Sequence, residues 1–264
     1  MNKNIKMIVT DLDNTLLRRD KTVSDYTASA FKRLRECGVV VAFATARYFR
    51  TVEEWVIPSI GIQPDIVISL NGAYAYANGR PLYQSTFSPD IGNALVTAVH
   101  KAGGMVTVGT DRIRYCERVI EDSHKSFSVA CKFDEPIDEN FHYMDLRGVD
   151  SAALEKIAGN FPTLRIQAYT DSALVTFQHI DARKETALSA VMEQLNILPR
   201  EVVAFGDDRN DIEMLRVCGF KVAVANALDE VKAVTDYVCG DCDEDGVARW
   251  IEENVFNNGG KRRY

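Results

Sequence analysis

The sequence lacks long apolar stretches and an excess of basic residues. None of its apolar runs approaches the roughly 20 residues that a membrane-spanning helix requires. The run that follows Lys3 and Lys6 is far too short for a signal peptide. Acidic residues outnumber basic ones by 38 to 31, for a net charge of −7. We therefore expect a cytoplasmic protein, a monomer or weak homo-oligomer, with neither nucleic acid nor a membrane as its partner.

Signatures of metal-binding and redox proteins are also scarce. The four histidines are scattered without the spacing of metal ligands, and without a secretory signal the six cysteines are expected to be reduced. Cys239-x-x-Cys242 has no second pair of cysteines or histidines near it, which argues against a zinc or redox site. The sequence also contains no Walker-type phosphate loop, no dinucleotide glycine fingerprint and no nucleophile elbow.

The N-terminal part has the pattern of a parallel α/β unit. With 264 residues and 46% hydrophobic content, the chain is long enough for one large globular domain or two modest ones. The apolar run Met7–Val9 predicts a buried strand, and Ser24 can cap a helix that runs to Cys37 and ends at Gly38. A second buried strand, Val39–Ala44, completes a strand–helix–strand unit, which implies a parallel sheet.

Polar residues follow both of these strands. Asp11 and Asp13 lie two positions apart after the first strand, so in an extended chain their carboxylates face one pocket. Asn14 tolerates the left-handed backbone of a tight turn. Thr45 lies where the second strand ends. Ligands of open α/β sheets bind beyond the carboxyl ends of the strands, so the three side chains are predicted to converge there.

The middle of the chain has a different pattern. A third strand ending near Leu70 is followed by a hairpin signal at Asn78-Gly79 and a helix from Ser88. Further strands and helices, among them a helix predicted over Glu121–Cys131, alternate as far as His179. This alternation is typical of a small α+β insert.

The first pattern then resumes. Asp181 is expected to cap a helix over Ala182–Leu195, and a buried strand over Val202–Phe205 ends in another group of polar residues. The core that begins at the N-terminus is therefore expected to continue after the insert.

In order along the chain, the polar segments resemble the four motifs of the haloacid dehalogenase superfamily of phosphatases. They are Asp11-Leu12-Asp13-Asn14-Thr15, then Thr45, then Lys184, then Gly206-Asp207-x-x-Asn210-Asp211. The insert and the segment Asp243–Ala248 resemble the Cof-type branch, subfamily IIB, which carries a large C2 cap. Ala46 and Asn14 stand where many relatives have glycine, and both replacements are small or compatible with a turn.

The resemblance implies an α/β fold with two domains. A doubly wound parallel-sheet core, Rossmann-like, would comprise residues 1–82 and 181–264. An inserted α+β cap, which would determine substrate specificity, would comprise residues 83–180.

It also implies a Mg²⁺-dependent reaction through an aspartyl-phosphate. Asp11 and Asp207 would bind Mg²⁺ through their carboxylates and Asp13 through its backbone carbonyl. Asp11 would also attack phosphorus, and Asp13 would act as general acid and then general base. Asp211 would support the metal or Lys184 without contacting the substrate. The residues expected to hold phosphate are Leu12, Thr45, Ala46, Lys184 and Asn210.

The expected substrate is a small phosphorylated metabolite, with sugar phosphates as the leading class and pyridoxal phosphate and flavin mononucleotide as open alternatives. A phosphomutase of the phosphomannomutase type would use the same nucleophile and is the main alternative function. A non-catalytic phospholigand-binding protein is disfavoured because Asp11 and Asp13 are both present. The candidates for contacts with the leaving group are Arg112, Arg114, Tyr115 and Arg118.

Overall fold

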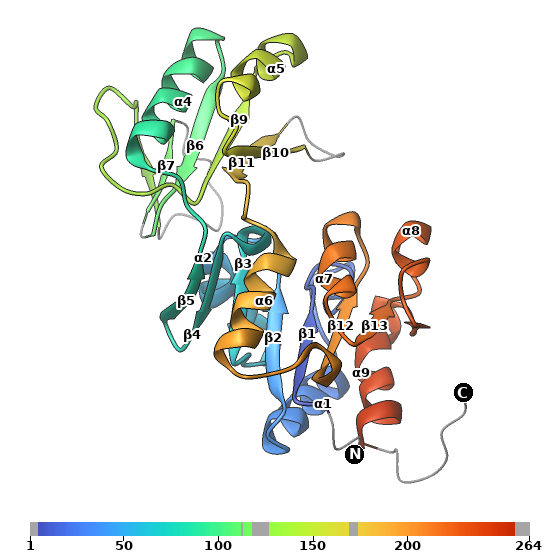
Figure 1. Cartoon of the computed structure of the whole chain (residues 1–264). Coiled ribbons are helices and arrows are strands. Elements are labelled where there is room, and N and C mark those ends of the chain that lie inside the picture. The colour runs from blue at the N-terminus through green and yellow to red at the C-terminus, as the bar shows by residue number, and fades with distance from the viewer. Residues whose placement is uncertain (1–4, 112, 118–126, 169–173, 257–264) are drawn as a thin grey trace. The chain divides into compact units, whose positions relative to one another are not determined.

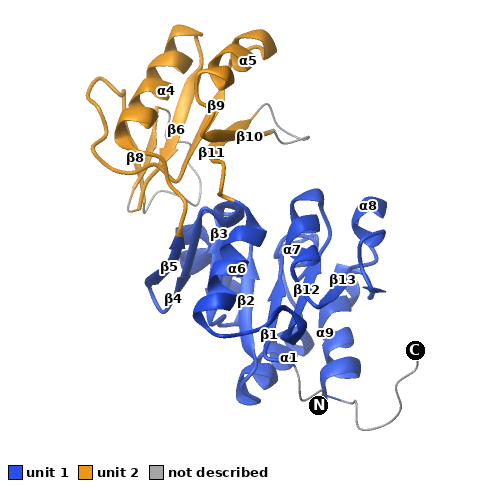
Figure 2. Ribbon diagram, viewed as in Figure 1, with its two compact units in different colours: residues 1–83, 183–264 blue, residues 84–182 orange. Residues whose placement is uncertain are grey.

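The chain forms two compact units (Figure 2). The computed structural model describes residues 5–111, 113–117, 127–168 and 174–256. Unit 1 consists of Met1–Tyr83 and Arg183–Tyr264, and unit 2 is Gln84–Ala182. Unit 2 is thus inserted into unit 1. Within the described ranges, no helix is both long enough and apolar enough to cross a membrane.

Unit 1 is built on an eight-stranded sheet (Figure 1). Its strands are β1 (Met7–Thr10), β2 (Val40–Ala44), β3 (Ile66–Ser69), β4 (Tyr74–Ala77), β5 (Arg80–Gln84), β12 (Val202–Gly206), β13 (Phe220–Ala223) and β14 (Tyr237–Val238). Across the sheet the order is β14-β13-β12-β1-β2-β3-β4-β5. The first six of these strands pair in parallel, and β4 pairs antiparallel with β3.

Helices cover both faces of this sheet. Met7, Ile8 and Val9 alternate between the faces, and all three are completely buried. Helices α1 and α9 pack against one another, as do α6 and α7. The helices are α1 (Asp25–Glu36), α2 (Phe49–Thr51), α3 (Ile57–Ile60), α6 (Lys184–Gln194), α7 (Ile212–Arg216), α8 (Asp229–Lys232) and α9 (Gly246–Ile251). The expected α/β fold with a parallel sheet is confirmed.

Local sequence explains where the first helix and turn lie. The Ser24 side chain accepts a hydrogen bond from the Thr27 amide at 3.1 Å and caps α1. Gly38, with φ +76°, ends the helix in the left-handed conformation. Asn14 has φ +61°, so the turn after β1 uses the left-handed backbone predicted for it.

Unit 2 has a six-stranded sheet with the order β10-β11-β9-β6-β7-β8. Its strands are β6 (Met105–Gly109), β7 (Arg114–Cys116), β8 (Ser128–Ala130), β9 (Tyr143–Arg147), β10 (Leu164–Ala168) and β11 (Val175–His179). Its helices are α4 (Pro89–Lys101) and α5 (Ser151–Gly159), which pack against each other and against this sheet (Figure 1).

The two faces of the unit 2 sheet differ in chemistry. Val108, Met144 and Phe177 lie side by side on β6, β9 and β11, and each is completely buried in an apolar cluster with residues of α4 and α5. Residues one position away along the strands point to the other face. There the corresponding cross-strand row is polar: Thr107, Asp145 and Thr176.

Two sequence-based expectations about local structure are wrong. The segment Glu121–Cys131 does not form one helix, because Ser128–Ala130 is a strand paired in parallel with β7, and residues 121–126 lie outside the described residues. Tertiary strand pairing overrides local helical propensity there. The helix predicted from Ala182 begins at Lys184, with Arg183 rather than Asp181 in the capping position.

Candidate active site

The polar residues after β1, β2 and β12 lie at one edge of the unit 1 sheet. Thr10 at the end of β1 pairs in register with Phe43 of β2 and with Phe205 of β12. The three parallel strands therefore end at nearly the same level. Asp11, Thr45 and Asp207 follow these ends directly. The convergence predicted from the sequence is thus a consequence of strand register.

Lys184 joins two of the carboxylates. It is the first residue of α6, and only 1% of it is exposed. Its Nζ donates to Asp11 Oδ1 at 2.6 Å and to Asp211 Oδ1 at 2.7 Å. Burial would lower the pKa of Lys184, but the charges of Asp11 and Asp211 outweigh it and raise that pKa. The ammonium is therefore charged and held between the two carboxylates.

Three carboxylates nevertheless crowd around this single ammonium. Asp11, Asp207 and Asp211 each present an oxygen within 4.8 Å of the others. Burial raises the pKa of Asp11 well above its usual value, and the charges of Asp211 and Asp207 add to the rise that Lys184 opposes. Burial likewise raises the pKa of Asp207 to about 6. The cluster carries more negative charge than its protein partners neutralise.

Asp211 is oriented by the backbone of its own loop. Its Oδ2 accepts the amides of Asp207 at 3.0 Å and Asp208 at 3.2 Å, while its Oδ1 accepts Lys184. A Cβ on Gly206 would lie 2.5 Å from the Asp211 Cβ, so the close approach requires glycine. Both Asp211 oxygens are therefore engaged by protein donors, and its supporting role stays a prediction.

Asp11 and Asp207 each retain an oxygen that can serve as a ligand. Asp207 Oδ1 accepts the Thr15 hydroxyl at 2.6 Å, and Asp11 Oδ1 accepts Lys184. Within the described part of the chain, the Oδ2 atoms of both residues accept no hydrogen bond. Carboxylate oxygens of this kind, in a cluster that carries excess negative charge, are a donor set that suits Mg²⁺.

The Asp13 side chain points to a different set of partners. Arg47 donates from Nε and from a terminal nitrogen to the two Asp13 oxygens, both at 2.7 Å, and Lys21 Nζ lies 2.9 Å from Oδ1. Burial would raise the pKa of Asp13, but the hydrogen bonds and charges of Arg47 and then Lys21 lower it below its usual value. Both Asp13 side-chain oxygens are therefore held by positive partners, and metal binding by its backbone carbonyl stays a prediction.

Two of the groups expected to hold phosphate are backbone amides without a protein acceptor. In the chain as described, the amides of Leu12 and Ala46 donate to no protein oxygen. Thr45 is 1% exposed; its amide donates to Ile68 O, and its hydroxyl accepts the Arg47 amide at 3.1 Å. Leu12 is completely buried and Ala46 is half-buried. Backbone N–H groups removed from water are almost always hydrogen-bonded in proteins, so these two unmatched amides after strand ends suit an anionic ligand.

Formal charges show why a divalent cation fits the site. The carboxylates of Asp11, Asp13, Asp207 and Asp211 contribute −4, and Lys184, Arg47 and Lys21 contribute +3. The sum is −1, which would repel a phosphate monoester dianion. A divalent cation among the carboxylates changes the sum to +1 and provides the attraction that is missing.

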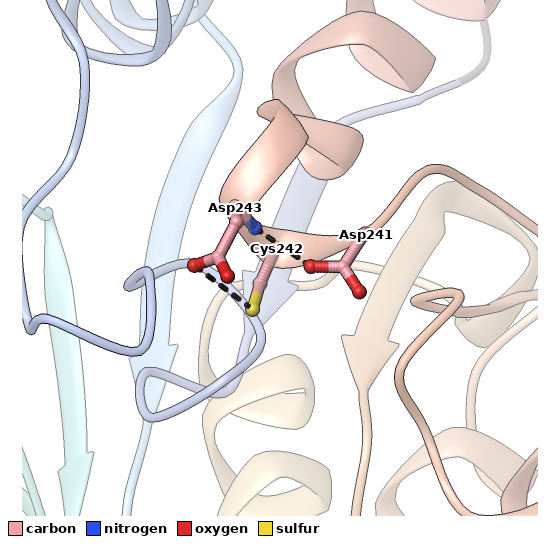
Figure 3. A group of neighbouring side chains, drawn as sticks. All are labelled: Asp241, Cys242 and Asp243. Atoms are coloured by element: carbon pink, nitrogen blue, oxygen red, sulfur yellow. Dashed lines mark hydrogen bonds between the residues drawn. The ribbon is translucent and has the colours of Figure 1, made fainter.

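Asp241, Cys242 and Asp243 form a second acidic cluster (Figure 3), and Arg19 is its protein cation. Arg19 donates to Asp241 at 2.9 and 3.0 Å and also pairs with Asp243. Burial first, and then the Asp241 charge, raise the pKa of the Cys242 thiol to about 11, and burial raises that of Cys239 to about 12. Protonated thiols are poor metal ligands, so Cys239 and Cys242 stay predicted as dispensable.

Among the four candidates for contacts with the leaving group, Arg114 lies on the polar face of the unit 2 sheet. It pairs with Gly109, in the same alternation as Thr107. Tyr115 belongs to the helix-covered face, and its hydroxyl donates to Glu139 at 2.8 Å. Arg112 and Arg118 lie outside the described residues.

Four residues of the site had no role assigned from the sequence: Thr15, which is part of the first motif, Lys21, Arg47, and Asn71, whose Oδ1 accepts a hydrogen bond from Asn210. Arg47 and Asn71 follow strand ends, so their positions alone could have marked them as candidates. Lys21 is on a loop at no distinctive spacing, and nothing in the sequence indicates that it reaches Asp13.

The chain is similar in sequence to known proteins over nearly its whole length. Residues 8–251 match the sequence model of a family described as haloacid dehalogenase-like hydrolase. A 5-amino-6-(5-phospho-D-ribitylamino)uracil phosphatase of Bacillus subtilis is 26% identical over 289 residues, which cover 94% of this chain and 96% of that protein. An HMP-PP phosphatase of Klebsiella pneumoniae is 26% identical, with 96% of each chain covered.

Solved structures share the fold over nearly the whole chain. The crystal structure of a hypothetical protein of Geobacillus kaustophilus superposes with a TM-score of 0.80 at 27% identity, covering 94% of this chain and 98% of the other. The match includes both units, so the inserted unit 2 is part of the shared architecture.

Proposed function

We propose that this chain, which belongs to the haloacid dehalogenase-like hydrolases, works with Mg²⁺ and through an aspartyl-phosphate. It is a phosphatase of small phosphorylated molecules. The observation that carries the proposal is the buried group formed by Asp11, Lys184, Asp207 and Asp211. It places one carboxylate beside an ammonium and beside a second carboxylate suited to Mg²⁺.

Each residue then has a part in the first half-reaction. The Asp11 carboxylate attacks phosphorus, the bond from phosphorus to the ester oxygen breaks, and Asp13 gives its proton to the departing alkoxide. Asp13 is ionised beside Arg47 in the free protein, but the negative charge of an entering phosphate raises its pKa and favours proton uptake. Mg²⁺, held by Asp11, Asp207 and the Asp13 carbonyl, would neutralise charge on the transferring group.

The second half-reaction uses the same groups in reverse. The Asp13 carboxylate removes a proton from water, the resulting hydroxide attacks phosphorus, and the Asp11 carboxylate leaves with inorganic phosphate as product. Lys184, the Asn210 side-chain amide, the Thr45 hydroxyl and the backbone amides of Leu12 and Ala46 would hold the phosphoryl oxygens in both steps.

The substrate we propose is a small phosphorylated metabolite, with sugar phosphates as the leading class. The B. subtilis relative is named for a substrate that carries a phospho-D-ribityl group, which is a phosphorylated sugar alcohol. The phosphate-directed groups all belong to unit 1 and are common to every phosphate ester. We propose unit 2 as the selector of the leaving group, supported by the polar row on its sheet.

The proposal predicts metal-dependent phosphate release that requires Asp11. Wild-type protein with Mg²⁺ should release phosphate from members of a phosphorylated-metabolite panel, and chelator should stop the release until Mg²⁺ is restored. Asp11→Asn should reduce kcat by at least about 10³-fold, because an amide oxygen is a poor nucleophile of the same size. Asp229→Asn is the matched control, since that side chain is fully exposed on α8.

Several outcomes would contradict this proposal. Full activity after thorough metal removal would refute the Mg²⁺ assignment, and more than a few per cent of activity in Asp11→Asn, with deamidation excluded, would refute the covalent step. Isomerisation of a sugar phosphate without phosphate release would identify a mutase. Asp145→Asn on the polar row should change the ranking of substrates in the panel, and an unchanged ranking would count against unit 2 as selector.

A further inference from the structure

The turn after β3 has an unusual backbone for three residues in succession. Leu70, Asn71 and Gly72 have φ of +52°, +53° and +95°. For residues other than glycine the left-handed region is unfavourable, so such a run persists only where surrounding contacts impose it. Asn71 is 3% exposed, and Leu70 is also buried. The strain is therefore stored inside unit 1.

Two backbone hydrogen bonds that impose this conformation are made with the segment after β2. The Asn71 amide donates to the Thr45 carbonyl at 3.0 Å, and the Leu70 amide donates to the Arg47 carbonyl at 3.0 Å. These bonds flank Ala46, whose amide is one of the two donors available for phosphate. The turn thus fixes the backbone of the phosphate-binding segment.

The Asn71 side chain is hydrogen-bonded to the segment after β12. Its Oδ1 accepts a hydrogen bond from Asn210 Nδ2 at 3.0 Å, across 139 residues of chain. Asn210 lies one residue before Asp211 in the loop that also supplies Asp207. Because Nδ2 donates to Asn71, the orientation of the Asn210 amide is set by this partner.

The third residue of the turn lies against the start of α6. A Cβ on Gly72 would be 2.1 Å from the Arg183 carbonyl oxygen and 2.7 Å from the Lys184 nitrogen. Only glycine permits such an approach. Residues 70–72 therefore touch the segments that contribute Thr45, Lys184 and Asn210.

We propose that Asn71 is a positioning residue that holds the Asn210 amide in the orientation needed to bind phosphate. Asparagine combines the two properties required here: it tolerates φ > 0, and it offers a side-chain carbonyl to a donor. Glycine would keep the backbone but leave Asn210 without this acceptor. The inference rests on the proposed function, because Asn71 has this role only if Asn210 binds phosphate.

A double-mutant cycle with a binding readout tests the inference. The dissociation constant of inorganic phosphate, at saturating Mg²⁺, is measured by calorimetry for wild type, Asn71→Gly, Asn210→Ala and the double variant. Loss of one oriented hydrogen bond should weaken phosphate binding about 5- to 10-fold in Asn71→Gly. If Asn71 acts through Asn210, the double variant should bind no more weakly than Asn210→Ala alone.

Asn78→Gly provides the matched control. Asn78 also has a left-handed backbone, with φ +49°, but it is exposed in the turn between β4 and β5. Its replacement should leave the phosphate affinity, kcat and KM unchanged. In Asn71→Gly the effect should appear mainly in KM and in product inhibition by phosphate, a division that a general loss of stability would not produce.

The inference would be overturned if Asn71→Gly bound phosphate as wild type does, or if the two single losses multiplied in the double variant. Wild type that binds phosphate but releases none from any substrate would refute the proposed function, while the cycle would still decide the role of Asn71. Wild type that releases phosphate but shows no coupling would refute the inference alone. Wild type that neither binds phosphate nor releases it from any substrate would refute both.

Discussion

Asp13 differs from Asp11 and Asp211 in its positive partners, which are Arg47 and Lys21 rather than Lys184. Arg47 contacts both of its oxygens in the paired geometry that makes arginine–carboxylate bonds strong. Lys21 adds a third contact from a loop residue with φ +68°. Because the folded-state pKa of Asp13 is lowered, the interaction stabilises the fold above the usual pKa and is lost as the pH falls through the folded-state pKa.

Replacement of Arg47 by methionine should therefore destabilise the protein in a pH-dependent way. We expect the free energy of unfolding at pH 7 to fall by about 1–2 kcal/mol, a modest value because both side chains are partly exposed. The difference from wild type should shrink below about pH 4, as measured by urea unfolding. Arg50→Met, which removes an exposed pair with Glu54, should cost no more than about 0.5 kcal/mol. If Arg47→Met reduced the free energy of unfolding equally at pH 7 and below about pH 4, this account would be contradicted.

At the scale of elements, one aspartate joins three segments around the start of α1. Asp245, at the start of α9, accepts hydrogen bonds from Ser24 at 2.7 Å, Thr27 at 3.0 Å and Arg18 at 3.0 Å. Burial opposes its ionisation, but the Ser24 and Thr27 hydroxyls and Arg18 outweigh burial and lower the pKa of Asp245. The loop after β1 is thereby held to both helices.

Asp245→Ala should be among the more destabilising changes in unit 1. Asp245 has φ +59°, so alanine would lose the three hydrogen bonds and also carry left-handed strain, for a cost of about 2–4 kcal/mol in urea unfolding. Asp245→Asn keeps an acceptor and tolerates the backbone, and should cost about half as much. The exposed control, Asp229→Ala, should change stability by no more than about 0.5 kcal/mol. If all three variants unfolded alike, Asp245 would not be the link between these segments.

At the scale of the whole molecule, unfolding should respond to Mg²⁺ differently at different pH values. Asp207 has a folded-state pKa of about 6 against a usual value of 3.8, and that of Asp11 is also raised. Between about pH 4 and pH 6 the folded, metal-free protein binds more protons than the unfolded chain. These groups therefore reduce stability as the pH rises through that interval.

Mg²⁺ should reverse this effect where the carboxylates are ionised. At a fixed Mg²⁺ concentration, the increase in Tm should be small at pH 5 and larger at pH 7.5, because metal binding releases the protons held by Asp207 and Asp11. Asp207→Asn should raise the Tm of the metal-free protein at pH 7.5 and abolish the response to Mg²⁺, whereas Asp229→Asn should leave both unchanged. Equal responses at both pH values, or a response that survives in Asp207→Asn, would contradict the prediction.

The sequence by itself determined the fold class, the family and the position of the chemistry along the chain. Buried strands read as continuous apolar runs, and the polar residues that follow them at Asp11, Thr45 and Asp207 are adjacent in sequence to those runs. Such patterns can be recognised without knowing which residues lie close together in the folded protein. It also predicted the cap of α1 at Ser24 and the left-handed turn at Asn14.

Only the tertiary structure decided which side chains hold the site together. Arg47 reaches Asp13 across 34 residues of chain, Asn210 reaches Asn71 across 139, and Thr15 reaches Asp207 across 192. The strand at Ser128–Ala130, predicted as part of a helix, likewise depends on pairing with β7. No periodicity or spacing encodes these pairs, because they form only when strand register brings the loops together.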